Sequence, residues 1–245
     1  MVMKGDVNRI LEVKGECPIC ESEATFSSKH SWLRDHFHCS RCGSIPRERA
    51  LMAVINQYFP DFRKLKIHES SPGGRGVSVK LSREAAFYSS SHFFPNCELG
   101  AVHEATGFRC ENLEQLTFDD NEFDLFITQD VMEHIYAPEK AFNEIARVLK
   151  PGGAHIFTVP LINKSKVSER WAELGEDGKP KFLFEPEFHG NPVDQAGSPV
   201  TMHWGYDIVR HIYDYSGMPT TMLTILNLQM GIRAEYIEVL VSVKS

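Results

Sequence analysis

From residue 65 onward, short apolar runs alternate with segments that have the pattern of helices. Strands separated by helices favour a parallel, doubly wound sheet with helices on both faces, and such sheets bind ligands at the carboxyl ends of their strands. We therefore predict a Rossmann-like α/β fold over residues 63–245. The expected strands are 65–69, 85–91, 108–113, 123–130 and 154–160, with helices over 76–85 and 138–150 and a chain break at the Pro-Gly-Gly before the fifth strand.

The length of 245 residues fits one large domain plus a small appendage, and 42% hydrophobic residues is ordinary for a globular protein. No apolar run approaches the roughly 18 to 20 residues that span a bilayer, and the first residues lack the apolar stretch of a secretory signal. The sequence thus predicts a cytoplasmic protein with no membrane partner.

The net charge of −7 is unevenly distributed. Residues 1–60 contain eight Lys and Arg against seven Asp and Glu, whereas the remainder contains 18 against 26. An acidic main domain does not attract a polyanion, which argues against nucleic acid as a substrate there, although the argument does not extend to the first 60 residues.

Four cysteines form two pairs near the amino terminus, Cys17 with Cys20 and Cys39 with Cys42, separated by eighteen residues. In a reducing compartment this spacing is typical of four thiolates around one zinc ion, and a filled tetrahedron makes the zinc structural. Residues 1–46 are predicted to form a zinc ribbon whose folding depends on binding of the metal ion. Two alternatives are a pair of disulfides and a ligand replaced by one of the intervening histidines, His30, His36 or His38.

An amphipathic helix over 47–62 is predicted to connect the ribbon to the main domain. Arg47 and Arg49 fit either substrate contacts or a solvated helix start.

Three consecutive motifs carry a resemblance to a known family. Residues 116–124, 132–135 and 147–153, within "LEQLTFDDNEFDLFITQDVMEHIYAPEKAFNEIARVLKPGG", resemble the corresponding motifs of class I S-adenosylmethionine-dependent methyltransferases of the type 11-like group. The resemblance covers roughly residues 65–160, and the apolar stretches 220–226 and 235–244 fit the antiparallel strand pair that closes that fold. It implies S-adenosylmethionine as cofactor.

The resemblance also implies a cofactor site. Glu69 matches the family's acid at the end of the first strand, which attracts the ammonium group of the cofactor, and Gly73 matches the middle glycine of the following loop. Ser71 stands where the first glycine is expected. Ser89, Ser90 and Ser91 replace the acid that usually holds the ribose.

Further along, the adenine and sulfonium contacts are expected from two other strand ends. Glu111 matches the position that accepts from the adenine amine, with the backbone of Asn112 and Leu113 beside the ring. Gln129 and Asp130 are expected near the sulfonium, and Asp130 also fits the N-cap of a helix over 131–135.

An insertion at about 164–206 is where this fold usually builds its acceptor pocket. It is rich in aromatic residues, Gly and Pro, and its first part, 164–181, fits either a lid or a surface helix and turn. We predict His203 as general base, with His189 as alternate, Trp204 and Tyr206 as walls of the acceptor pocket, and His134 as a pocket-lining or structural residue. The alternative for each is a packed loop residue that meets no substrate.

The predicted function is methyl transfer to a hydroxyl group of a small molecule or sugar, with histidine as base. Two alternatives remain open: a non-catalytic binding module with a zinc ribbon, and an enzyme that uses the sulfonium for an intramolecular displacement. The identity of the acceptor and the oligomeric state do not follow from the sequence.

Overall fold

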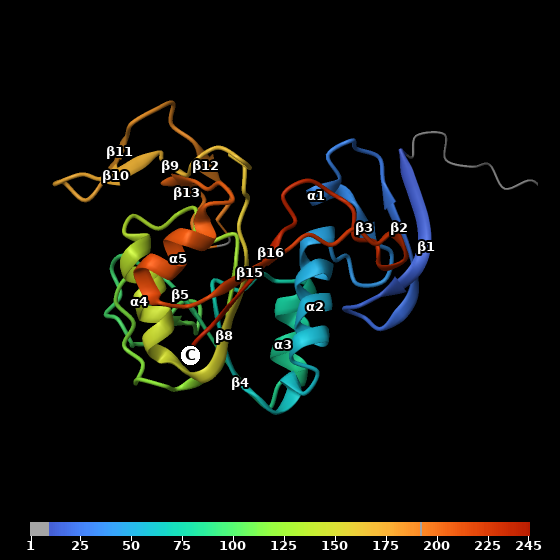
Figure 1. Ribbon diagram of the computed structural model, residues 1–245, viewed down its shortest axis with the longest axis horizontal. Helices are drawn as coiled ribbons and strands as arrows, with labels where there is room; N and C mark the ends of the chain where they lie inside the picture. Colours follow the sequence, from blue (N-terminus) through green and yellow to red (C-terminus); the bar gives the residue numbers. More distant parts are fainter. Residues whose placement is uncertain (1–9, 192) are drawn as a thin grey trace, which may run out of the picture.

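The computed structural model describes residues 10–191 and 193–245, and its main feature is a seven-stranded mixed sheet (Figure 1). The strand order is β15-β16-β8-β7-β4-β5-β6. Strands β4 to β8 run parallel, and β16 and β15 close the sheet as an antiparallel pair. The strands are β4 Lys66–Ser70, β5 Phe87–His92, β6 Arg109–Cys110, β7 Phe123–Gln129, β8 Leu149–Thr158, β15 Thr220–Leu223 and β16 Val239–Val243.

Helices cover both faces of this sheet, as expected for a doubly wound fold. Successive side chains of a strand point to opposite faces, so Ile127 packs toward α2 and α3 whereas Phe126 packs toward α4 and α5. Helices α4 and α5 lie together on the second face (Figure 1). The helices are α1 Leu33–His36, α2 Pro46–Tyr58, α3 Gly76–Glu84, α4 Pro138–Val148 and α5 Ile208–Ser216, with short 3-10 turns η1 Phe62–Lys64 and η2 Leu228–Met230.

Several expected element boundaries differ from the structure, among them those of β8 and β6. Strand β8 begins at Leu149 and includes the Pro-Gly-Gly that was expected to precede it. Gly152 has a φ of +79°, and a side chain at Gly153 would approach the Asp124 carbonyl to 2.9 Å, so the glycines let the strand pass an irregularity in its pairing with β7. Strand β6 is only two residues long.

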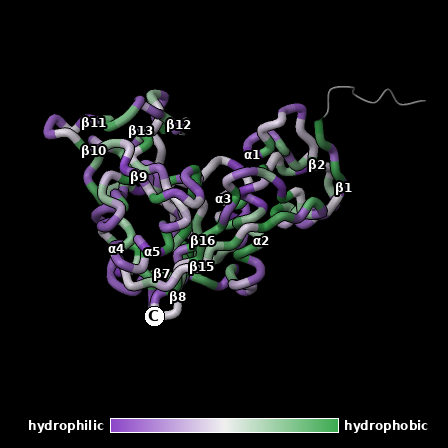
Figure 2. Tube along the Cα trace, turned by 45° about the horizontal axis from the view of Figure 1, so that its top comes forward, coloured by the Kyte–Doolittle hydropathy of each residue, from purple (hydrophilic) through white to green (hydrophobic). Residues whose placement is uncertain are grey.

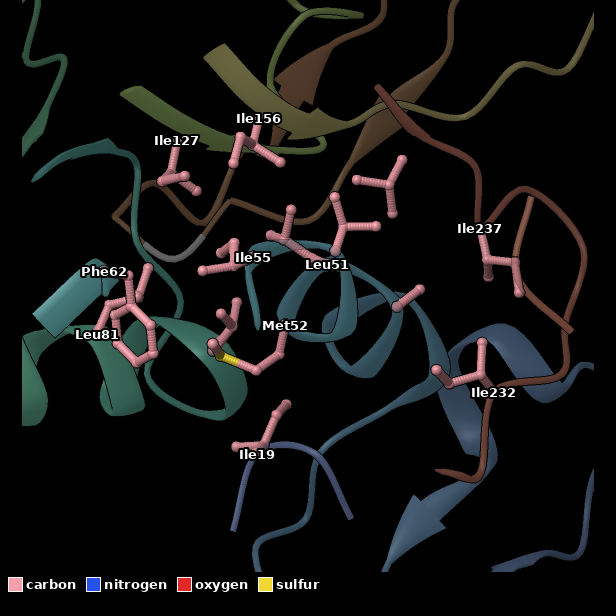
Figure 3. Packing of buried hydrophobic residues seen from close by; sticks show 14 of the residues in the cluster. Ile19, Leu51, Met52, Ile55, Phe62, Leu81, Ile127, Ile156, Ile232 and Ile237 are labelled. Atoms are coloured by element: carbon pink, nitrogen blue, oxygen red, sulfur yellow. The ribbon is translucent and has the colours of Figure 1, made fainter. Parts of the chain in front are cut away.

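The amino-terminal region is a three-stranded antiparallel sheet, β1 Leu11–Cys17, β2 Ser22–Ser28 and β3 His38–Cys39. It shares one hydrophobic core with α2, α3 and the carboxyl-terminal segment 224–238, which crosses to it from β15. Figure 3 shows part of this core, where Ile19, Leu51, Met52, Ile232 and Ile237 are labelled. Figure 2 shows hydrophobic stretches around α2, β15 and β16. The amino-terminal sheet therefore packs against the main domain through a shared hydrophobic core.

Arg49, at the start of α2, is fully buried in this shared core and is neither a substrate contact nor part of a solvated helix start. Its guanidinium donates hydrogen bonds to the carbonyls of Ser44, Phe37 and Gly231, and it lies over the ring of Phe26. A buried cation needs such partners, and here they tie three segments together.

The insertion 164–206 forms three small antiparallel pairs, β10 with β11, β12 with β13, and β14 with β9. They lie above the sheet at the end where α5 begins (Figure 1). Their bounds are β9 Glu169–Arg170, β10 Ala172–Leu174, β11 Pro180–Phe182, β12 Phe188–His189, β13 Ser198–Pro199 and β14 Met202–His203.

Candidate functional site

A cavity of about 1380 Å³ opens at the carboxyl ends of the parallel strands. Most of its lining comes from the loop after β4, the segments after β5, β6 and β7, the insertion 164–206, and the region of α1 and α2. This is the edge at which doubly wound sheets bind ligands. The insertion that was expected to border an acceptor does border this cavity.

In the loop after β4, Ser71 has the left-handed backbone conformation that is usual for a glycine. Ser71 has a φ of +56°, in the left-handed region that glycine enters without cost, and its N–H donates to the carbonyl of Ser91 at 2.7 Å. Ser71 and Gly73 both line the cavity. Gly76 has a φ of +60° and leaves room for the carboxylate of Glu48.

Glu69 lies behind this loop, and its side chain is not among those that line the cavity. Its carboxylate is fully buried and accepts hydrogen bonds from Ser78 at 2.6 Å, Gln129 at 2.7 Å and Tyr88 at 2.8 Å. Burial raises the pKa of Glu69, against the effect of the three donors. Ser78 and Gln129, which Glu69 orients, are the side chains that reach the cavity.

The serines expected to hold the ribose do not line this cavity. Ser91 is fully buried, and its hydroxyl lies 2.9 Å from Nε2 of His68, while Ser89 lies 2.9 Å from Nδ1 of the same ring. Burial lowers the pKa of His68 to about 3, so the ring is neutral. Ser90 borders a separate, smaller hollow.

Strand β5 runs one residue further than expected, and His92 and Phe93 line the main cavity at its end.

The segment after β6 also reaches the cavity. Glu111, Asn112 and Leu113 all line it. The Glu111 carboxylate is already engaged by Arg109, at 2.6 Å, and by the N–H of Thr117, at 2.9 Å. Both interactions stabilise the short loop from which Asn112 and Leu113 reach the cavity.

Gln129 and Asp130 line the cavity at the end of β7. Asp130 does not cap a helix, because residues 131–135 form no helix and turn only at Met132 and Glu133. Its carboxylate forms ion pairs with Arg34, at 2.8 Å, and Arg47, at 2.9 Å. Burial alone would raise the pKa of Asp130, but these two cations outweigh it and lower the pKa to about 2. Asp130 thus joins the amino-terminal region to the end of β7.

His203 and His189 both line the cavity and share one carboxylate. Nε2 of His203 lies 2.9 Å from one oxygen of Glu187, and Nε2 of His189 lies 3.2 Å from the other. The ring of His203 stacks on Trp171 with centroids 3.7 Å apart. The neighbouring Glu133 carboxylate raises the pKa of His189, against the effect of burial, and Glu187 acts in the same direction.

His134 lines the same part of the cavity, directly beside Glu133. Its Nδ1 donates to the carbonyl of Pro199 at 2.8 Å, because a carbonyl only accepts. Its Nε2 lies 3.8 Å from the carboxylate of Glu133.

Neither expected aromatic wall borders the cavity. Trp204 is fully buried in the core between α4 and α5, where its indole N–H donates to the carbonyl of Met132. Tyr206 is 37% exposed and lies outside the lining. Trp204 therefore packs in the hydrophobic core, although it belongs to an aromatic-rich insertion.

The four cysteines expected to bind zinc meet in space. The Sγ atoms of Cys17, Cys20, Cys39 and Cys42 all lie within 4.8 Å of one another, with Cys17 and Cys42 at 3.7 Å and Cys20 and Cys39 at 4.0 Å. Sulfurs at about 2.3 Å from a tetrahedral zinc ion lie about 3.8 Å apart, so the cluster fits that ion.

Several charged residues that line the cavity were not predicted as site residues, among them Arg34, Arg47, Glu133 and Glu187. Arg47 was considered only as a solvated residue or a substrate contact. Glu133 and Glu187 each stand within two residues of a histidine that was singled out, and that proximity was the available signal.

Comparisons with known proteins agree with this arrangement. Residues 77–157 match a family described as a methyltransferase domain. A ubiquinone biosynthesis O-methyltransferase from Parvibaculum lavamentivorans is 25% identical over 122 residues, which are 47% of this chain and 47% of that protein. The chain thus spans about half the length of this curated relative. Among the described residues, no helix is long and apolar enough to cross a membrane.

The crystal structure of an S-adenosylmethionine-dependent methyltransferase from Mesorhizobium loti has the same fold. It aligns with a TM-score of 0.50 at 16% identity, over 80% of this chain and 98% of that chain. Residues 77–157 are therefore similar to a methyltransferase domain, and the likeness to the crystal structure, at 16% identity, shows a shared Rossmann-like fold.

Proposed function

We propose that this chain transfers a methyl group from S-adenosylmethionine to a hydroxyl group of a small molecule. The observation that carries the proposal is that the loop after β4 and a group of histidines and carboxylates line the same cavity. A cofactor held by the loop would then face an acceptor held beside the histidines. The curated relative, an O-methyltransferase, is consistent with an oxygen acceptor.

In this proposal the cofactor end is held mainly by backbone and neutral side chains. The loop of Ser71 and Gly73 would receive the methionyl part, Gln129 would lie near the sulfonium, and Asn112 and Leu113 would flank the adenine ring. Glu69 would act through Ser78 and Gln129, whose orientation it fixes. With neither Ser90 nor Ser91 on this cavity, the ribose would lie against His92 and Phe93.

S-adenosylmethionine supplies a methyl group on a positively charged sulfur. In the proposed transfer, the acceptor oxygen would form a bond to that methyl carbon while the carbon–sulfur bond breaks, and the electron pair of the broken bond would stay on sulfur. We assign His203 as the general base that would accept the proton of the acceptor hydroxyl, with His189 as the alternate base. Nε2 of neutral His203 donates to Glu187, which leaves Nδ1 to take the proton and places a carboxylate beside the resulting imidazolium. General base catalysis of this kind contributes roughly 10² to 10⁴ in rate.

We also propose that the four cysteines hold a structural zinc ion. The spacing of the sulfurs supports this, as does the position of the cluster in a core that includes the carboxyl-terminal segment. Four protein ligands leave no open position for chemistry, so the ion would stabilise the fold.

Titration calorimetry with S-adenosylmethionine and S-adenosylhomocysteine tests the proposed function. We expect one binding site per chain for each. No heat and no thermal shift at millimolar ligand would contradict the proposal and favour a non-catalytic binding module. Mass spectrometry after incubation with cofactor alone tests intramolecular displacement, for which a changed cofactor would be the signature.

A further inference from the structure

Glu133 is a buried carboxylate without a hydrogen-bond partner among the described residues. The residue is 2% exposed, and neither side-chain oxygen accepts a hydrogen bond. Its backbone carbonyl is fixed by the N–H groups of Thr201 and Met202 and by the Thr201 hydroxyl, so the side chain is held at the cavity. A buried charge without a partner is costly, and such a group normally pairs or coordinates a metal ion.

Two histidines present a ring nitrogen to this carboxylate. Nε2 of His134 and Nδ1 of His189 each lie 3.8 Å from Oε1 of Glu133, which is too long for a hydrogen bond. The three groups offer one ligand atom each, and these atoms lie within 4.8 Å of one another. Ligand atoms bound at about 2.1 Å to one ion lie about 3 to 4 Å apart, so the spacing suits a shared ion.

The far nitrogen of each ring is bound to an oxygen acceptor. Nδ1 of His134 donates to the carbonyl of Pro199, and Nε2 of His189 donates to Glu187. In the neutral rings the lone pairs are therefore on the two nitrogens that face Glu133. Histidines that bind metals almost always have their other nitrogen fixed by a carbonyl or carboxylate in this way.

We propose that Glu133, His134 and His189 bind a divalent transition-metal ion at the acceptor side of the cavity. Two imidazoles and one carboxylate leave coordination positions open, as in catalytic metal sites and unlike the four-cysteine cluster. The role of this ion rests on the proposed function: the ion would bind the acceptor hydroxyl and lower the pKa of that hydroxyl. His189 is then a ligand, and His203 with Glu187 remains to accept the proton.

Manganese binding tests the site without any methyl transfer. Mn²⁺ favours hard ligands such as carboxylates over thiolates, so it is added to protein whose cysteine cluster holds its zinc. Free Mn²⁺ is followed by electron paramagnetic resonance. We expect one bound Mn²⁺ per chain, released by added Zn²⁺. Because the readout is binding alone, failed metal binding and failed cofactor binding are distinguishable.

Four variants assign the binding to these residues. Glu133→Gln and His189→Ala should each weaken binding at least tenfold, and Glu187→Gln, which loosens His189, by about 10- to 100-fold. Glu139→Gln, an exposed carboxyl-to-amide change on α4, should bind as the wild type does. No loss of the free Mn²⁺ signal with wild-type protein would overturn the site, as would wild-type affinity in Glu133→Gln. If Glu133→Gln does not fold, His189→Ala carries the same test, because that side chain is 38% exposed.

Discussion

The four-cysteine cluster and the Glu133–His134–His189 cluster place potential metal ligands in two contrasting ways. The first draws its ligands from two short turns, and its members belong to a core. The second joins the turn after β7 to strand β12, more than fifty residues later, and lines a cavity. A complete set of four ligands suits a structural ion, whereas a set of three at a cavity leaves room for a reacting group.

The two regions are also physically connected. Arg34 and Arg47, from the region of the cysteine cluster, form ion pairs with Asp130, three residues before Glu133. The amino-terminal region therefore borders the cavity as well as supporting the core, and the predictions below test how far the two clusters differ in role.

The largest expected effect is on stability, from Cys39→Ser. Structural zinc sites contribute about 10 to 16 kcal/mol in small zinc domains, so loss of one ligand should lower the free energy of unfolding by at least about 5 kcal/mol. Calorimetric melting and zinc content measure this. Cys97→Ser, outside the cluster, is the control. Unchanged zinc and melting temperature in Cys39→Ser would show that the cluster holds no structural ion.

The next effect is on turnover, from His203→Ala. Loss of a general base should lower kcat about 10² to 10⁴-fold while cofactor affinity stays within about twofold. The control is His211→Ala, on α5, which should keep its rate. Full turnover in His203→Ala would remove this residue from the mechanism.

A smaller effect, on stability, concerns the link at Asp130. Its pKa is about 2 in the fold against an ordinary value of 3.8, so the ionised group contributes stability that is present above about pH 4 and is lost as pH falls toward 2. Asp130→Asn should therefore be about 2 kcal/mol less stable than wild type at pH 7. Denaturant unfolding across pH measures the gap, which should close by about pH 2. A gap that does not change with pH would argue against the ion pairs.

The smallest effect is expected for Ser91→Ala. The hydroxyl bonds to His68, so its loss should cost about 1 kcal/mol of stability and leave cofactor affinity within about twofold. Calorimetry on the cofactor measures the affinity, and a tenfold loss would restore Ser91 to the ribose site.

The sheet and the cysteine cluster were predictable from sequence because both depend on local patterns. Alternating apolar runs fix which residues form strands, and the spacing of Cys17 and Cys20 fixes a turn that aims two sulfurs at one point. The residues around the cavity were less predictable. Their roles depend on which partner a polar side chain meets, and for Ser91 that partner is His68, on the neighbouring strand.

Long-range pairing also explains the missed and mistaken residues. Asp130 meets Arg34 nearly a hundred residues away, and Trp204 meets the carbonyl of Met132. No local period in the sequence indicates such contacts. In the sequence, Glu133 is one residue of a motif that indicates the fold, and its burial without a hydrogen-bond partner among the described residues is evident only from the structure.

The most direct test of the account is a crystal structure with S-adenosylhomocysteine and Mn²⁺ bound together, with anomalous scattering used to locate the manganese. The account predicts S-adenosylhomocysteine along the loop of Ser71 and Gly73, and an anomalous peak at Glu133, His134 and His189 in the same cavity. S-adenosylhomocysteine bound elsewhere, or no peak at these three residues, would contradict it.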